Sequence, residues 1–313
     1  MSVETMRSVV VGQYGTNEEV HIAQVARPEP KAGEILIKVC AAGVNPIDWK
    51  IRSGAGQRLG MTLPIHLGGE LVGMVENLGA GVDQFAAGDT VFGMVPSGAF
   101  ADYAVSKAAD MVRVPPSLSL VQAAALPLAG TTAWQAMFGE TQLIAGQRIL
   151  ITNSSGGVGS LAVQFAKATG AHVTAVASGR NEAFVRSLGA DVFIDYTQEA
   201  FENIACDMHM VLDTVGGDTF ARALRTLRPG GSMVTVVAFP DGEAERLGVR
   251  ARRSFTVPSA ANLSAIAALV ERGKVTPHID EVFPLENIRV ALATSEGGRV
   301  RGKVVLAVAP LSS

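Results

Sequence analysis

The feature that most constrains the fold is a glycine-rich turn set between a short apolar run and a longer amphipathic one. Gln147–Thr152 is rich in β-branched residues, and Ser154-Ser-Gly-Gly-Val-Gly159 follows it at once. After the turn, apolar residues recur at the spacing of one helix face until Gly170, a candidate C-cap: Val158, Leu161, Ala162, Phe165 and Ala166. The sequence therefore predicts a strand, a tight turn and a helix, in that order.

Strand and helix patterns continue to alternate beyond this helix. An Ala-rich helical stretch over 121–138 precedes the first strand, and later strands are predicted over 172–177, 191–195, 208–213 and 232–237, with helices over 182–188 and 218–227. This alternation is typical of a parallel sheet with right-handed crossovers. We therefore expect an α/β fold with a doubly wound parallel sheet.

The first third of the chain has a different residue pattern, in which short β segments are separated by glycine. Strands are predicted over 34–40, 71–75 and 90–95, which suits a partly open β-barrel or sheet. A helix over 263–271 then leads to an apolar strand over 302–308, which needs a sheet to join. We therefore expect a β domain made of residues 1–120 and 263–313, with a parallel-sheet domain over 121–262 inserted into it.

The glycine-rich turn also predicts a ligand. Phosphate binding requires backbone N–H groups aimed at the anion at the start of a helix, with no side chain in the way. Ser155, Gly156, Gly157, Val158 and Gly159 stand where a dinucleotide fingerprint would, although Ser154 replaces the first glycine of the pattern. The alternative is a glycine turn that binds nothing.

The end of the second strand of this unit indicates which dinucleotide binds. An acidic residue there would hold a ribose diol, but this chain has Ser178 and Arg180 and no carboxylate before Glu182. A hydroxyl and a guanidinium suit a 2′-phosphate, so NADPH is favoured over NADH. The alternative is that Ser178 only caps the next helix and Arg180 is solvated.

Charge and composition exclude several classes of protein. Lys and Arg number 26 and Asp and Glu 29, so no basic excess favours nucleic acid or an anionic membrane. Met1–Arg7 holds no apolar run of signal-peptide length, and prolines break the longest uncharged stretch, between Arg113 and Glu140. We expect a cytoplasmic protein without nucleic-acid or membrane partners.

Several further motifs, taken in order, resemble those of the medium-chain dehydrogenase/reductase family, and within it the zinc-independent NADPH:quinone oxidoreductase (zeta-crystallin-like) branch. They include Gly43-Val-Asn-Pro-Ile-Asp48, Leu67-Gly-Gly-Glu-Leu-Val-Gly73, Ala124-Ala-Leu-Pro-Leu-Ala-Gly-Thr-Thr-Ala133 and Gly302-Lys-Val-Val. The resemblance covers essentially the whole chain. It implies a Rossmann domain inserted into a GroES-like partly open β-barrel domain.

Metal ligation is not expected. The chain resembles the zinc alcohol dehydrogenases in two segments where those enzymes have a ligating cysteine and a Gly-His-Glu sequence. At these two places this chain has Asn45 and Gly68-Gly69-Glu70. The only cysteines are Cys40 and Cys206, so a four-thiolate zinc loop is absent too. Cys206 and His209 are the remaining pair of candidate metal ligands. The simpler interpretation is that they are ordinary residues at the entry of a strand.

A reductase without a Lewis acid suits an acceptor that is already electrophilic. The leading hypothesis is an NADPH-dependent oxidoreductase that transfers hydride to a quinone or a related electron-poor conjugated carbonyl. One alternative is an enoyl-thioester or α,β-unsaturated ketone (enone) reductase. Another is an NADPH-binding sensor or structural protein without turnover.

At the reacting end, the resemblance implies that Asn45 lines the substrate site and that Thr132 contacts the nicotinamide. Asn45 could donate to an acceptor carbonyl, and Asp48 would organise the loop by hydrogen bonds; turn chemistry for Asn45 and a helix cap for Thr132 are the alternatives. The loop Trp49–Arg58 lacks the tyrosine acid common in related enoyl-thioester reductases, so the general acid is left open.

Four further residues are candidates for coenzyme contacts. Tyr196 resembles a position near the adenosine phosphate, with a core tyrosine as the alternative. Phe255 and Val257 are predicted to lie over the nicotinamide, unless they belong to an apolar strand. Asp213 ends a strand at the carboxyl edge where ligands bind, although a solvent-facing loop residue would look the same. The apolar segment 254–257 also predicts a sheet edge that pairs in a homodimer.

Overall fold

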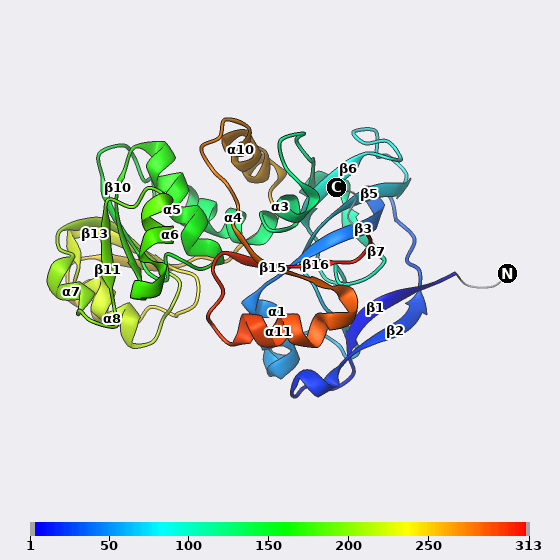
Figure 1. Cartoon of the computed structure of the whole chain (residues 1–313), viewed down its shortest axis with the longest axis horizontal. Coiled ribbons are helices and arrows are strands. Elements are labelled where there is room, and N and C mark those ends of the chain that lie inside the picture. The colour runs from blue at the N-terminus through cyan, green and yellow to red at the C-terminus, as the bar shows by residue number, and fades with distance from the viewer. Residues whose placement is uncertain (1–3, 311–313) are drawn as a thin grey trace. The chain divides into compact units, whose positions relative to one another are not determined.

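The computed structural model describes residues 4–310, so part of the Met1–Arg7 segment lies outside it. The chain forms two compact units (Figure 1). The first holds residues up to Leu128, Pro258–Ser264 and the chain from Ile279 onward; the second holds Ala129–Val257 and Ala265–His278. The first unit thus extends eight residues beyond the expected boundary at 120, because the strand-rich unit keeps the first alanine-rich helix.

The second unit is built on a parallel sheet of six strands in the order β11-β10-β9-β12-β13-β14. Its strands are β9 (Arg148–Ile151), β10 (His172–Ala177), β11 (Val192–Asp195), β12 (Met208–Asp213), β13 (Leu227–Thr235) and β14 (Arg250–Arg253). This order runs outward in both directions from the first strand, which is the doubly wound arrangement of dinucleotide-binding sheets. The predicted α/β fold with a parallel sheet is confirmed.

Helices connect these strands. They are α4 (Pro127–Trp134), which crosses the boundary between the units, α5 (Gly157–Thr169), α6 (Glu182–Ser187), α7 (Phe201–Ile204), α8 (Asp218–Leu224) and α9 (Glu243–Arg246). One face of the sheet buries Leu150, Val176 and Val211 against Phe201 of α7 and Phe220 of α8. Figure 1 shows α5 and α6 beside the sheet in the same unit. Gly170 ends α5 in the left-handed conformation (φ 85°), as its C-cap pattern predicts.

The first unit is strand-rich. Its strands are β1 (Thr5–Val11), β2 (Val20–Ala26), β3 (Glu34–Val44), β4 (Ile65–His66), β5 (Glu70–Leu78), β6 (Thr90–Met94), β7 (Tyr103–Lys107), β8 (Met111–Arg113), β15 (Ile279–Pro284) and β16 (Lys303–Ala307). Its helices are α1 (Pro46–Lys50), α2 (Gly56–Arg58), α3 (Leu120–Ala124) and α11 (Ile288–Glu296), while α10 (Ala260–Glu271) begins in this unit and ends in the other. The C-terminal strand β16 pairs antiparallel with β3, so the end of the chain returns to this β unit.

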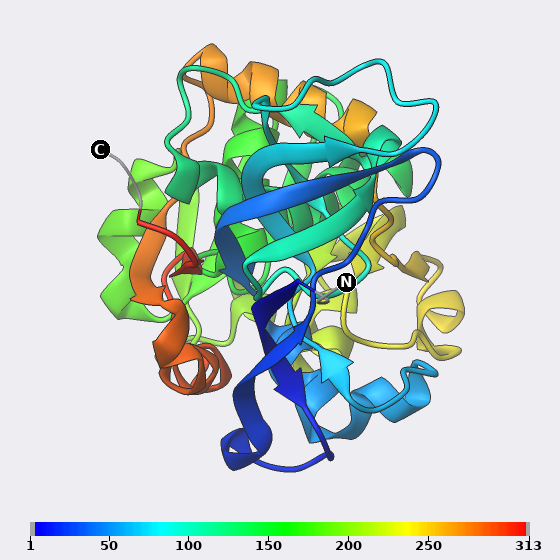
Figure 2. The same cartoon turned by 90° about the vertical axis from the view of Figure 1, so that its right-hand side faces the viewer.

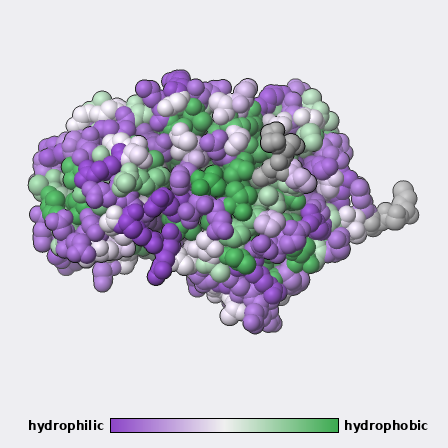
Figure 3. Space-filling model, in the orientation of Figure 1, coloured by the Kyte–Doolittle hydropathy of each residue, from purple (hydrophilic) through white to green (hydrophobic). Residues whose placement is uncertain are grey.

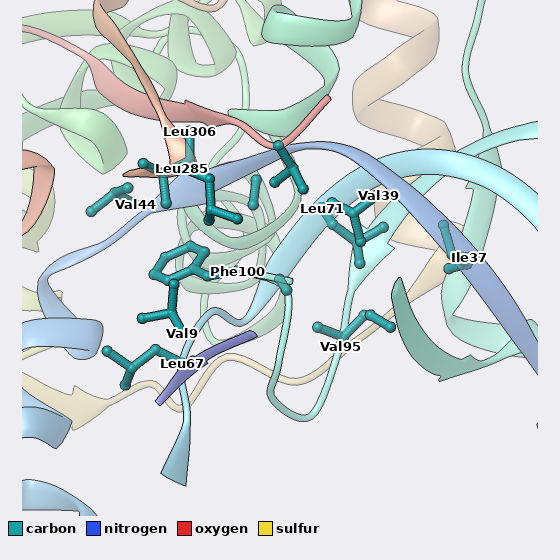
Figure 4. Packing of buried hydrophobic residues seen from close by; sticks show 14 of the residues in the cluster. Val9, Ile37, Val39, Val44, Leu67, Leu71, Val95, Phe100, Leu285 and Leu306 are labelled. Carbon is teal, nitrogen blue, oxygen red and sulfur yellow. The ribbon is translucent and has the colours of Figure 1, made fainter. Parts of the chain in front are cut away.

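Figure 2 turns this unit toward the viewer, and its long curved strands enclose the apolar interior seen in Figure 4. Phe100 is buried in that interior, with Val9 and Leu67 on one side of its ring and Val44 and Leu306 on the other. These side chains come from segments almost 300 residues apart in the sequence, which is why the two pieces of the unit fold together.

Two local predictions were wrong, and one strand was missed. The helical stretch 121–138 is divided, because Ser119 caps α3 in a capping box with Gln122 and Pro127 begins the new helix α4. Residues 254–257 are irregular, and the sheet ends instead at β14. That strand was missed because three of its four residues are arginine, and charged residues are typical of exposed edges but not of apolar runs.

Hydrophilic residues predominate on the face drawn in Figure 3, with hydrophobic residues gathered in smaller patches. Within residues 4–310, none of the helices combines the length and the hydropathy that crossing a bilayer requires.

Candidate active site

The glycine-rich turn follows β9 at the carboxyl edge of the parallel sheet and leads directly into α5. Gly156 is the extended N-cap residue, and no side chain of the described part of the chain caps this helix. A Cβ on Gly156 would lie 2.7 Å from Asn153 Nδ2, and one on Gly159 only 2.2 Å from the Asn153 carbonyl oxygen. Backbone thus lies against backbone at Gly159, and the Asn153 side chain lies against Gly156, so both positions require glycine at the start of α5.

The two serines of the turn have different surroundings. Ser154 is fully buried, and its hydroxyl donates to the Val176 carbonyl of the neighbouring strand (3.1 Å). Ser155 accepts a hydrogen bond from Asn181 Nδ2 (3.1 Å), and Asn181 lies 3.1 Å from the Ser178 hydroxyl in the same way. Asn181 thus links the glycine turn to the end of β10, a role that the sequence analysis missed because the residue stands in an ordinary helix-start position.

The next loop carries the residues predicted to select the coenzyme. Arg180 is exposed, and Tyr196, 56% exposed, is not the core tyrosine considered as the alternative. Asp195 ends β11, and a Cβ on Gly179 would lie 2.4 Å from its Oδ2. Hydrogen bonds from the Thr197 side chain and backbone, opposed by slight desolvation and helped by the Gly179 N–H, lower the pKa of Asp195. Its carboxylate is therefore held by protein groups.

Asp213 ends β12 but is fully buried, so a solvent-facing loop position is wrong for it. Its Oδ1 accepts hydrogen bonds from Thr152 Oγ1 (3.2 Å) and from the N–H groups of Val215 (3.0 Å) and Gly216 (3.1 Å). Its Oδ2 accepts from Thr235 Oγ1 (2.8 Å). The carboxylate thus ties the ends of three strands to the loop that follows β12.

Thr132 lies inside α4, not at a helix start, so it does not cap the helix. Its hydroxyl is 2.6 Å from that of Thr256, and Gln135 exchanges two hydrogen bonds with the backbone of Val257 (2.9 and 3.1 Å). These contacts anchor segment 254–257, which lies outside the strands of the sheet. Phe255 and Val257 of this segment are 64% and 57% exposed.

Phe255 also stacks on a cation. The guanidinium carbon of Arg253 lies 4.8 Å from the ring centre of Phe255 and 3.9 Å from that of Phe239. Cation–π contacts of this kind orient exposed rings. The segment after β14 therefore presents ordered aromatic surface beside the carboxyl edge of the sheet in its own unit.

In the first unit, Asn45 belongs to a buried polar cluster. Lys303 Nζ donates to Glu70 Oε1 (2.8 Å), to the Val44 carbonyl (3.1 Å) and to Asn45 Oδ1. Asn45 Nδ2 donates to Glu70 Oε1 (2.6 Å) and more weakly to the Gly43 carbonyl (3.3 Å). Each donor of the ammonium and amide groups thus has a partner, as burial requires.

Two members of this cluster were not predicted. Glu70 and Lys303 are 0% and 5% exposed and form an ion pair. The signal for them was a charged residue directly before each of two apolar runs, Leu71–Val75 and Val304–Val308, since such charges are rarely buried unless they are paired. A Cβ on Gly43 would lie 2.2 Å from Glu70 Oε1, so the glycine makes room for the carboxylate.

Asp48 stands beside this cluster and is almost fully buried. Its Oδ2 accepts the N–H of Asn45 (2.7 Å) at the start of α1, as expected of a residue that organises the loop. Desolvation raises the pKa of Asp48 to about 7; backbone hydrogen bonds and Lys303 oppose the rise, and Glu70 adds to it. The side chain therefore changes charge near neutral pH.

Within the described residues 4–310, no three His, Cys, Asp or Glu side chains gather in a group that could hold a metal ion. His66 Nδ1 lies 2.8 Å from the Ser8 hydroxyl, and His209 Nδ1 accepts the N–H of Arg148 (3.2 Å). Both histidines thus have local polar partners.

Comparison with known proteins gives consistent matches over nearly the whole chain. Residues 31–116 match the alcohol dehydrogenase GroES-like domain, and residues 188–306 match the zinc-binding dehydrogenase family. The mouse protein named NAD(P)H oxidoreductase RTN4IP1, mitochondrial, is 34% identical, with 97% of this chain and 89% of that protein covered.

Two further likenesses concern reductases. The Arabidopsis thaliana NADPH-dependent alkenal/one oxidoreductase, chloroplastic, is 34% identical over 96% of this chain and 79% of its own length. The solved structure of the quinone oxidoreductase from Coxiella burnetii has 33% sequence identity and a TM-score of 0.93, covering 98% of this chain and all of that one.

Proposed function

The chain belongs to the medium-chain dehydrogenase/reductase family of oxidoreductases, and we propose that it reduces quinones or related electron-poor conjugated carbonyls with NADPH. The observation that carries the proposal is the uncapped glycine turn at the carboxyl edge of the sheet, which leaves no room for side chains at Gly156 and Gly159. Relatives named as quinone and alkenal/one oxidoreductases support the acceptor class.

The coenzyme is NADPH, and the residues present suit it. The backbone of Ser155, Gly156, Gly157, Val158 and Gly159 would hold the pyrophosphate at the start of α5. When bound, NADPH supplies the hydride, and the protein supplies its binding and orientation. The buried carboxylate of Asp213 contributes indirectly, since it holds the N–H groups of Val215 and Gly216 in place at the same edge.

Three side chains would recognise the 2′-phosphate. Arg180 and Tyr196 are exposed on neighbouring loops, and the Ser178 hydroxyl is held next to them by Asn181. A guanidinium and two hydroxyls match the donors that a phosphate dianion requires. The nearby Asp195 carboxylate accepts two hydrogen bonds from Thr197, both through Oδ1.

For the nicotinamide end, we assign contacts to Thr132, Phe255 and Val257. The support is that α4 fixes the 254–257 segment through Thr132 and Gln135 while leaving the two apolar side chains exposed. Apolar surface that is ordered and exposed can exclude water from a flat aromatic ligand.

For the acceptor we assign Asn45, with Asp48 shaping its loop. Both N–H groups of the Asn45 amide have partners in the protein, so donation to a carbonyl oxygen requires release of the weaker bond to Gly43. Lys303 and Glu70 hold the amide in a single orientation. No metal takes part in this proposal, because Asn45 and Gly69 stand where the resembled zinc enzymes have a cysteine and a histidine.

The test is a screen of NADPH oxidation with quinones, enones and enoyl thioesters, combined with product analysis. Turnover with quinones and no saturated carbon–carbon bond supports the quinone assignment. A saturated product supports the enone alternative, which the alkenal/one relative favours. NADPH binding without turnover of any acceptor would leave only a sensor or structural role. Activity that survives chelators, in protein without stoichiometric zinc, supports the metal-free part.

A homodimer and a cytoplasmic location complete the proposal. The outer edge of β14, at the end of the sheet, offers backbone groups for antiparallel pairing with a second copy. Light scattering measures the oligomeric state, and cell fractionation the location, for which relatives named as mitochondrial and chloroplastic make organelles the alternative.

A further inference from the structure

A cavity of about 570 Å³ lies at the opposite edge of the parallel sheet from the glycine turn. It is lined by the segment before β9 (Gly139–Leu143 and Gln147) and by the amino-terminal parts of β12, β13 and β14. His209, at this edge, and Asp213, at the coenzyme edge, are four positions apart on β12, or roughly 13 Å at about 3.3 Å per residue. The cavity is therefore distinct from the proposed coenzyme site.

The charge of the cavity is strongly positive. Arg228, Arg250 and Arg252 line it, and Glu140 is the one carboxylate among its lining residues. None of the three guanidinium groups forms an ion pair with any carboxylate within residues 4–310. Arg250 makes a long contact of 3.4 Å with the Gly230 carbonyl. Clustered arginines that form no ion pair repel one another, and an anion relieves the repulsion.

His209 adds a further unmet donor. Its Nδ1 accepts the N–H of Arg148, so the neutral ring carries its hydrogen on Nε2. That Nε2 lies 3.0 Å from Nη1 of Arg228, also a donor. Desolvation, Arg228 and Arg148 all lower the pKa of His209, in agreement with a positive surrounding. Two donors that face each other at this distance lack an acceptor, which an oxygen anion would supply.

The walls define the size and chemistry of the ligand. The volume falls in the range of small-molecule sites, about 300–1,000 Å³, and is too large for one inorganic ion. Met210 and Met233 add buried apolar surface, while Gln142 and Ser232 add polar groups. Arginine forks match the paired oxygens of phosphate.

We propose that this cavity binds a phosphate-bearing small molecule, with Arg228, Arg250 and Arg252 contacting its phosphate oxygens. It is a second anion site of the coenzyme-binding unit, and it does not depend on the function proposed above. Arg228 and His209 together donate to one oxygen, and the outer arginines hold a further phosphate.

The test titrates the full-length protein with tripolyphosphate, with citrate as a carboxylate probe of similar charge, and follows the imidazole signals of ¹³C-labelled histidine by NMR. His209→Gln identifies the His209 signal, and His21, His66 and His278 report on places outside the cavity. We expect a saturable shift of the His209 signal with tripolyphosphate and a much smaller one with citrate.

The double variant Arg228→Gln/Arg250→Gln should weaken tripolyphosphate binding at least tenfold, as read from the same signal. Arg246→Gln is the matched control, because Arg246 is an exposed arginine of α9 outside the cavity. Thermal unfolding of each variant checks the fold. The proposal is overturned if the His209 signal does not shift. This holds also where a second copy of the chain covers the cavity and prevents the shift. An equal response to citrate, or equal binding by the two variants, overturns the proposal as well.

Discussion

The ammonium group of Lys303 lies 2.8 Å from the Glu70 carboxylate, and both side chains are buried inside the β unit. The two residues are 233 positions apart in the sequence. Their contact joins the last strand of the chain, β16, to β5 and holds the amide of Asn45 between them. An isolated buried charge is strongly unfavourable, so each residue depends on the other.

Removing one partner of this pair should therefore destabilise the protein strongly. We expect Lys303→Met or Glu70→Gln to lower the free energy of unfolding by about 3–5 kcal/mol, and the double variant to lose less than the sum of the two. Urea unfolding measures each value. The exposed pair Glu182–Arg186 is the control, where Arg186→Gln should change stability by less than about 0.5 kcal/mol. Additive losses at Lys303 and Glu70 would contradict the coupling.

The pH dependence of stability should report on Asp48. Its pKa is about 7 in the folded protein against 3.8 as the ordinary value, so the folded state binds this proton more tightly. The contribution of Asp48 to the free energy of unfolding therefore falls as pH rises from about 4 to about 7, by a few kcal/mol. Asp48→Asn should remove this fall.

The measurement is urea unfolding of wild type and variant at several pH values between 4 and 8. Asp83→Asn, at an exposed position of the same unit, provides the reference for removal of one carboxylate. If the difference between Asp48→Asn and wild type does not grow with pH over this interval, the assigned pKa is wrong.

Substitutions at two glycines of the turn should affect coenzyme binding and stability to different degrees. An alanine methyl at Gly156 meets the amide end of Asn153, a side chain that can move, and also narrows the path to the N–H groups. Gly156→Ala should thus weaken NADPH binding at least tenfold with little loss of stability. At Gly159 the methyl meets backbone at 2.2 Å, so Gly159→Ala should lower the melting temperature as well.

Coenzyme fluorescence and thermal unfolding give the two quantities. Gly12→Ala, where the nearest atom would be 3.8 Å from the new Cβ, serves as the glycine control. Unchanged NADPH affinity in Gly156→Ala would exclude this turn as the pyrophosphate site.

Arg180 should decide between the two nicotinamide coenzymes. Loss of a guanidinium that contacts a 2′-phosphate affects NADPH alone, because NADH lacks that phosphate. We expect Arg180→Gln to raise the dissociation constant for NADPH about tenfold or more, with the value for NADH changed less than twofold. Calorimetry with both coenzymes measures the ratio, and Arg186→Gln, an exposed arginine of the following helix, is the charge-matched control. Equal losses for both coenzymes would argue against a phosphate contact.

Much of the coenzyme-binding unit could be predicted because its signals are local. The run 147–152, the glycine turn and the apolar period of α5 lie within 25 residues of one another. Each of these patterns predicts its own element, a strand, a turn and a helix, without help from distant residues. The strand β14 could not be found in this way, since its arginines follow an edge position that only the assembled sheet defines. The boundary near Pro127 was also hidden, because alanine-rich sequence on both sides favours helix equally.

The candidate site, too, could be predicted from the sequence only in part. The sequence alone determined that a glycine-rich turn opens a helix of a parallel-sheet unit, and that Asn45 and Asp48 share one loop; phosphate binding by that turn stays a prediction. Only the tertiary structure decided that Glu70 and Lys303 form hydrogen bonds with the Asn45 amide and that Asp213 is buried with both of its oxygens hydrogen-bonded. It also decided that three arginines from two strands line one cavity. The physical reason is range: propensity and periodicity act over a few turns, whereas a buried charge finds its partner only when strands hundreds of residues apart are brought into contact.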